Sequence, residues 1–312
     1  MAIKKVEIRD FLVFKGEFAA DFCSGINVFI GGNGTGKTTL LKCLYGFKRS
    51  YAQLVTNDGK NIVTNDNMAL VAIIETKAGK YVREWGNAII DDEIKNCVYI
   101  PEKDILEHAK GLLTFIEQKH TGFSPIYKDI LISAQDVPTL KQSEIQKAIG
   151  QKIVDIINGS IHWDKGDGSF YTLKTNGSRI PFANEASGYK KFGFLGLLVS
   201  SGQLEPGTVL LWDEPENSLN PELIPKLVDI LLELSRNSVQ IFIGTHSELL
   251  ASYFAVNREK NDKVQFMSLY KDREQIKVDI SERFDLLEPN NLTAEPVKLY
   301  EKEIEKGLGG NE

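Results

Sequence analysis

The segment Gly31-Gly32-Asn33-Gly34-Thr35-Gly36-Lys37-Thr38 restricts the fold of this chain more than any other feature of its sequence. It matches the pattern G-x-x-x-x-G-K-[ST] throughout, and a short apolar strand, Val28-Phe29-Ile30, leads into it. Thr38–Tyr45 follows as an apolar-rich helix. Glycines in such a loop let backbone N–H groups turn inward without Cβ clashes, and the helix N-terminus adds partial positive charge. The sequence therefore predicts a phosphate-binding loop between a strand and a helix.

The residues of this loop have distinct expected roles. Lys37 is expected to reach the β- and γ-phosphate oxygens of a nucleotide and to face solvent in its absence. The hydroxyl of Thr38 is expected to bind Mg²⁺, so ATP and Mg²⁺ are the predicted ligands. The expected nucleotide-contacting residues are Gly31, Gly32, Asn33, Gly34, Thr35, Gly36, Lys37, Thr38 and Thr39.

A second acidic motif fits the same chemistry. Val209–Trp212 is an apolar run, and Asp213 and Glu214 follow it at the expected end of a strand. Ligands of parallel sheets bind at the carboxyl ends of the strands. Asp213 is therefore predicted to hold Mg²⁺ directly or through water, and Glu214 to orient and deprotonate an attacking water. Lys37 and Asp213 lie much farther apart in the chain than the corresponding residues of ring-forming AAA+ motors, in which the acidic motif follows the phosphate-binding loop much sooner.

The residues after this motif resemble those of the ABC-type ATPases. Asp213-Glu214-Pro215 with Ser218-Leu219-Asn220-Pro221 is similar to the family's Walker B and D-loop, and Ile241–Ser247 to its switch strand. Asn33 and the stretch Val98-Tyr99-Ile100-Pro101 resemble the stand-alone RecF/SMC/OLD-like branch, and more closely the small bacterial "AAA family" ATP/GTP phosphatase-like proteins. The resemblance implies that His246 contacts the γ-phosphate.

Two positions depart from the family pattern. The family's Leu-Ser-Gly-Gly-Gln signature, which caps the γ-phosphate bound by the opposing subunit, is reduced to Ser187-Gly188. These residues still supply a hydroxyl and free N–H groups at a helix start, although Ser187 could instead be a simple N-cap. Where transporter members have Pro-Gln, this chain has Pro101-Glu102, so Glu102 is a candidate ligand of a metal-bound water. An adenine-stacking aromatic is unassigned, since Phe11 and Phe14 could both be core residues.

Composition limits the setting in which these motifs operate. The 312 residues carry a net charge of −6, so no overall basic field indicates nucleic acid, although a local basic face is compatible with it. The longest near-apolar run, Phe192–Val199, is far shorter than the roughly 20 residues of a membrane span. The N-terminus reads as a strand, and Cys23, Cys43 and Cys97 are widely spaced. We therefore expect a cytoplasmic protein without a membrane segment.

The expected fold class is α/β: an ABC-type P-loop head with a mixed or parallel central sheet, an antiparallel β subdomain and a helical insertion. A helix is expected to begin at Thr139 with Gln142 in a capping box, to bury Ile145, Ile149, Ile153, Ile156 and Ile157 on one face, and to stop at Asn158-Gly159. We expect one domain, 1–312, divided into an N-terminal β part with the phosphate loop (1–102), the helical insertion (103–158), a core with signature, Walker B and switch (159–262), and a terminal hairpin with a last helix near Val297–Lys306 (263–312).

The leading functional hypothesis is an ATPase that associates head-to-tail through the nucleotide and controls a partner protein. The resemblance suggests an effector encoded nearby, with a role in antiviral defence. A DNA-repair ATPase of RecF/SMC type, a transporter subunit and a non-catalytic nucleotide-gated scaffold are the alternatives. The reduced signature counts against a transporter subunit, and the intact Glu214 counts against a scaffold. No long heptad run in 103–158 supplies the arms of an SMC-type tether.

Overall fold

The computed structural model describes residues 3–49, 69–76, 79–84, 96–118, 125–135 and 142–308. Among these residues, no helix combines the length and the apolar character needed to cross a lipid bilayer. The expected helix start at Thr139 lies outside the described residues.

A six-stranded sheet forms the centre of the molecule, in the order β13-β12-β3-β11-β10-β6. Five strands are parallel, and β13 pairs antiparallel to β12 at one edge. All residues of β3, β10 and β11 are buried, which agrees with the apolar runs that predicted strands covered on both faces. The strands are β3 (Ile26–Ile30), β6 (Asn96–Ile100), β10 (Thr208–Asp213), β11 (Gln240–Gly244), β12 (Val264–Asp272) and β13 (Gln275–Ser281).

The register of this sheet brings its functional ends together. Gly244 pairs with both Asp213 and Phe29, and Trp212 pairs with Ile100. The parallel strands β3, β11, β10 and β6 therefore end at a common edge, where the loops after Ile30, Asp213 and Gly244 begin. This edge is where ligands bind in parallel α/β sheets.

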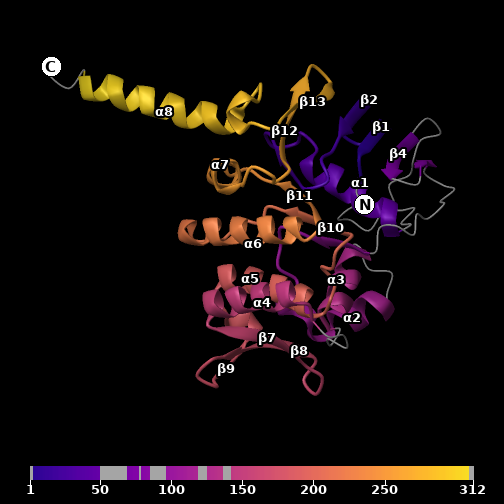
Figure 1. The fold of residues 1–312 in the computed structure, drawn as a ribbon, viewed down its shortest axis with the longest axis vertical. Coiled ribbons are helices and arrows are strands. Elements are labelled where there is room, and N and C mark those ends of the chain that lie inside the picture. Colours follow the sequence, from indigo (N-terminus) through magenta and orange to yellow (C-terminus); the bar gives the residue numbers. More distant parts are fainter. Residues whose placement is uncertain are drawn as a thin grey trace.

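Helices cover the sheet and connect its strands. Figure 1 shows α4 and α5 near the three-stranded sheet, with α6 and α7 between them and the β12–β13 hairpin. In α6, seven buried aliphatic residues lie on the face that packs on the core. The covering helices are α1 (Lys37–Arg49), α5 (Ser187–Ser200), α6 (Ile224–Arg236, after the 3₁₀ turn Pro221–Leu223) and α7 (Glu248–Asn257).

Two smaller antiparallel sheets flank the centre. A four-stranded sheet, in the order β2-β1-β4-β5, contains β1 (Lys5–Phe11), β2 (Phe14–Asp21), β4 (Ala69–Thr76) and β5 (Gly79–Glu84). A three-stranded sheet contains β7 (Gly159–Asp164), β8 (Ser169–Lys174) and β9 (Arg179–Pro181). The expected fold class is therefore confirmed: a mixed central sheet with an added antiparallel part and a helical segment.

The helical segment contains α2 (Ala109–Gln118), α3 (Pro125–Gln135) and α4 (Glu144–Ile157). The expected start of α4 was wrong by one helical turn. Its capping box is formed by Ser143 and Gln146, whose side chains each accept from the other's backbone N–H. Ile145 is 41% exposed and does not join the buried face, which contains Ile149, Ile153 and Ile157, and Ile156 is only half-buried. The expected stop is confirmed, with Asn158 in the left-handed conformation.

The last helix is longer than expected. α8 spans Asn291–Leu308 and includes Pro296, which precedes the expected range near Val297–Lys306. Figure 1 shows α8 projecting from the body beside the β12–β13 hairpin. Val297, Tyr300 and Ile304 are exposed at 54%, 64% and 44%.

Candidate nucleotide site

Lys37 is buried, not solvent-facing as expected. Only 6% of its surface is exposed, and its Nζ donates to the carbonyl oxygens of Gly31 at 2.8 Å and Gly32 at 3.3 Å. Nζ also lies 2.9 Å from Nε2 of His246. Burial lowers the pKa of Lys37 to about 8, although Glu214, Asp213 and Glu216 oppose that shift. The loop therefore folds around its lysine, which occupies the interior of the loop.

Two glycines of the loop are required by their surroundings. Gly31 has φ +147°, and a Cβ there would lie 2.3 Å from the carbonyl oxygen of Leu269. Gly36 has φ +96°, and a Cβ there would lie 2.7 Å from the ring of Phe14. Phe14 and Phe11 are both buried in the core, so neither offers a free face to a base in this structure. Asn33 and Gly34 are exposed at the tip of the loop.

Asp213 and Thr38 form the candidate metal position. The hydroxyl of Thr38 donates to Oδ2 of Asp213 at 2.7 Å, and the Tyr99 hydroxyl lies 3.4 Å from the same oxygen. Oδ1 of Asp213 is buried without a hydrogen-bond partner. A buried carboxylate oxygen without a donor is costly, and a divalent cation would satisfy it. One carboxylate, one hydroxyl and phosphate oxygens are a donor set that suits Mg²⁺.

Glu214 and His246 meet above the lysine. Oε1 of Glu214 lies 3.3 Å from Nε2 of His246, which is also the nitrogen near Lys37. Burial raises the pKa of Glu214, and the neighbouring charges of Glu102, Glu216 and Asp213 add to the effect. Burial and the Lys37 charge lower the pKa of His246. A neutral imidazole that accepts from Lys37 and a carboxyl with a raised pKa are suited to proton transfer.

Glu102 lies at the rim of the same group. Its Oε1 accepts from Nδ2 of Asn217 at 2.9 Å. Burial raises the pKa values of Asp213 and Glu214, and the charge of Glu102 adds to this effect. Glu102 is exposed and forms no hydrogen bond with Thr38, so it lies beside the candidate metal position and is not part of the hydrogen-bonded pair of Thr38 and Asp213.

The candidate signature residues lie at the start of α5. Ser187 is the first helical residue and is exposed, and the capping residue is Ala186, which makes no side-chain cap. Ser187 is therefore not the N-cap that the sequence left as an alternative. Gly188 is buried, and a Cβ there would lie 3.2 Å from Leu219. Ser187 lines a cleft with residues of 102–127 and 187–191 and with Asn217 and Ser218, and none of residues 31–39 lines it.

Sequence reasoning missed two residues of this region. Oε1 of Glu216 accepts from the hydroxyl of Thr245 and from the backbone N–H of His246, so it holds the loop that carries the histidine. Nζ of Lys191 donates to the carbonyl oxygens of Glu214 and Pro215. The partners of Glu216 and Lys191 are mostly backbone groups far away in the chain, and no sequence pattern predicts such contacts.

Comparisons with known proteins agree with this geometry. A family described as "AAA domain, putative AbiEii toxin, Type IV TA system" matches residues 111–252, and one described as "AAA ATPase domain" matches residues 1–79. No curated protein sequence matches the chain.

Two solved structures share the fold. An Smc head bound to the C-terminal winged-helix domain of ScpA has a TM-score of 0.54 at 13% identity, covering 90% of this chain and 98% of that one. An Smc head with an extended coiled coil, bound to the C-terminal domain of ScpA derived from Pyrococcus furiosus, has a TM-score of 0.53 at 11% identity, with 96% and 99% covered. Identities this low show the fold alone.

The phosphate-binding loop, the matched segments and the shared fold agree with one another. The chain folds as a P-loop head like those of the Smc structures, and its segments 1–79 and 111–252 match AAA-type ATPase families.

Proposed function

We propose that this protein binds Mg·ATP at the 31–39 loop and hydrolyses it. The observation that carries the proposal is that Lys37 and Glu214 both lie within hydrogen-bonding distance of Nε2 of His246. Beside them lies Asp213, whose buried Oδ1 has no hydrogen-bond partner. On nucleotide binding, Nζ of Lys37 would exchange the carbonyl oxygens of Gly31 and Gly32 for phosphate oxygens, which carry more negative charge.

The metal would be held by Oδ1 of Asp213 and the hydroxyl of Thr38, and Glu102 would hold a water bound to it. Bound there, Mg²⁺ would neutralise charge on the phosphates and keep them in place. The Glu214 carboxylate would accept the proton of the attacking water, and His246, which lies beside Glu214, would contact the γ-phosphate.

We further propose that the site is completed by a second copy of the chain. Ser187 and Gly188 begin a helix whose first N–H groups have no side-chain cap, so they are available to an anion. Ser187 lines a cleft that contains none of residues 31–39, which supports a role toward the nucleotide of another subunit. ATP would thus act as the contact that joins two heads in a head-to-tail homodimer or a higher oligomer.

The finer role that we propose is control of a partner effector in antiviral defence. The description of the matched 111–252 family, which names a toxin of a toxin–antitoxin system, supports this role, and the two matched Smc heads are bound to a partner domain. The candidate docking surfaces are the 103–158 insertion and the 284–307 segment, whose Val297, Tyr300 and Ile304 are exposed. A cytoplasmic location fits this role.

Co-purification tests the effector role. The Glu214→Gln protein, expressed with the product of the adjacent gene, should form a complex whose yield differs between ATP-loaded and nucleotide-free forms. The control is a variant with Val297 and Tyr300 changed to Ser, which removes apolar surface only from α8. If no complex forms in any nucleotide state, the effector role fails, and an ATPase acting independently on DNA, of the RecF/SMC kind, becomes the better account.

A further inference from the structure

Lys191 joins the start of α5 to the turn that carries Glu214. It lies one helical turn after Ser187, and its Nζ donates to the carbonyl oxygen of Glu214 at 2.9 Å and to that of Pro215 at 3.3 Å. A contact of 2.9 Å from an ammonium group is a well-formed charge-assisted hydrogen bond. The candidate signature helix and the candidate base are therefore connected within one chain.

The turn that receives this contact has an unfavourable backbone. Glu214 has φ +48°, in the left-handed region that side chains disfavour, and Ser218 has φ +62° in the same turn. The backbone N–H of Glu214 donates to Gly244, and its carbonyl oxygen accepts from Asn217 as well as from Lys191. The direction of the Glu214 side chain thus depends on contacts that hold its backbone, and Lys191 supplies one of them from another element.

The surroundings of Lys191 keep its ammonium group at this position. Burial lowers the pKa of Lys191 to about 8, while Glu216, Asp104, Glu102 and Glu214 all favour the charged form. A partly buried cation among carboxylates has few alternative positions, because leaving them would remove its compensating charges.

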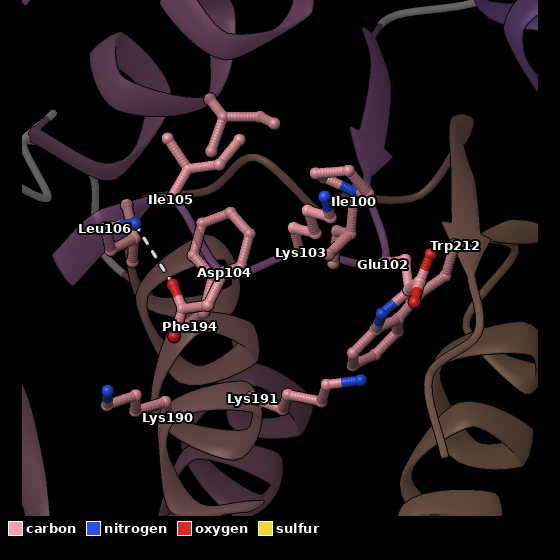
Figure 2. Close-up of a pocket in the computed structure, with 12 residues that line it drawn as sticks. Ile100, Glu102, Lys103, Asp104, Ile105, Leu106, Lys190, Lys191, Phe194 and Trp212 are labelled. Atoms are coloured by element: carbon pink, nitrogen blue, oxygen red, sulfur yellow. Dashed lines mark hydrogen bonds between the residues drawn. The ribbon is translucent and has the colours of Figure 1, made fainter. Parts of the chain in front are cut away.

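The adjacent Lys190 provides an internal comparison. Figure 2 shows Lys190 and Lys191 leaving α5 in opposite directions, with Lys191 on the side of Trp212. Nζ of Lys190 donates to Glu107 at 2.6 Å and to the carbonyl oxygen of Ala183 at 3.0 Å. Lys190 therefore fastens α5 to the 3₁₀ turns on the other side and forms no hydrogen bond with the turn 213–218.

We propose that Lys191 is a positioning residue. When Ser187 binds the nucleotide of a second copy, the start of α5 moves, and Lys191 transmits this movement to the carboxylate of Glu214. This role rests on the proposed composite ATPase site. Removing the contact should leave nucleotide binding intact, because Lys191 does not belong to the 31–39 loop. It should slow the chemical step, because an incorrectly placed base loses much of its effect.

The test compares Lys191→Met, Lys191→Arg and Lys190→Met with the wild type in steady-state ATP hydrolysis and in Mg·ATP binding. Lys191→Met should lower kcat by about 10-fold or more while the dissociation constant changes by less than about two-fold. Lys191→Arg, which restores a cationic donor, should recover most of kcat, and Lys190→Met should lower kcat much less than Lys191→Met does. If Lys191→Met melts below the assay temperature, Lys191→Gln provides the same comparison.

Two results would overturn the inference while leaving the proposed function intact. One is a kcat of Lys191→Met close to that of the wild type. The other is an equal loss in Lys191→Met and Lys190→Met without rescue by arginine, which would indicate general packing of α5. A wild-type protein that binds ATP without hydrolysing it would overturn both this inference and the proposed function.

Discussion

Glu214→Gln is expected to lower ATP turnover by about 10²-fold or more, the usual scale for loss of a general base. The amide keeps the size of the side chain but cannot accept the proton of the attacking water. The raised pKa of Glu214, caused by burial and by the charges of Glu102, Glu216 and Asp213, brings the carboxylate closer to the basicity that proton transfer requires. Mg·ATP affinity should persist, because the amide removes negative charge from the neighbourhood of the phosphates.

Phosphate release from Mg·ATP under single-turnover conditions measures this effect. Glu222→Gln is the matched control. Glu222 is exposed on the 3₁₀ turn that follows the loop after Glu214, and its carboxylate accepts a hydrogen bond from the neighbouring Asn220. It should turn over at the wild-type rate. Retained hydrolysis in Glu214→Gln would place the base elsewhere, with His246 as the next candidate because it lies 3.3 Å away.

The second large effect concerns binding. Lys37→Ala should weaken Mg·ATP affinity strongly, because Lys37 is the loop's cation and is already directed to the interior where phosphates would lie. The fold should survive, since removing a desolvated ammonium group also removes the cost of burying it. Lys37→Met, which keeps the aliphatic stem, separates the loss of charge from the loss of packing. Calorimetric titration measures both, and near-wild-type affinity in either variant would remove this loop as the nucleotide site.

A pH series adds an independent signature of the same lysine. The pKa of Lys37 is lowered to about 8, so the free protein loses this cation as the pH rises through that value. Phosphates stabilise the charged form, and binding therefore takes up a proton above about pH 8. Wild-type affinity should fall as the pH rises through this range, and Lys37→Met should lack that component of the decrease.

Much of this site could be predicted because its residues are adjacent in sequence. The loop 31–38 and the run Val209–Glu214 each combine an apolar strand with the functional side chains that follow it, and both strands lie in the sheet as expected. The burial of Lys37 could not be predicted, because one of its contacts is His246, which comes from a distant strand end. Lys191 and Glu216 were missed for a similar reason: backbone carbonyl and N–H groups are present at every residue.

The helix boundaries show a different limit. Thr139-x-x-Gln142 and Ser143-x-x-Gln146 both match a capping box, and local sequence does not choose between them. The structure uses the second, so that Ile149, Ile153 and Ile157 are buried and Ile145 is not. For α8 the expected range was near Val297–Lys306, yet the helix begins at Asn291 and continues through Pro296.

The central claim, that ATP joins two copies of this chain in a composite site, is tested most directly by the mass of the ATP-loaded protein in solution. Light scattering of Glu214→Gln with Mg·ATP should give about twice the chain mass of 34.9 kDa, and a single-chain mass without nucleotide. Ser187→Arg, introduced into that background, should stay at the single-chain mass, and Ser178→Arg, on an exposed turn outside the site, should still associate. An ATP-loaded Glu214→Gln protein that remains a single chain, alongside a wild type that hydrolyses ATP normally, would contradict the account.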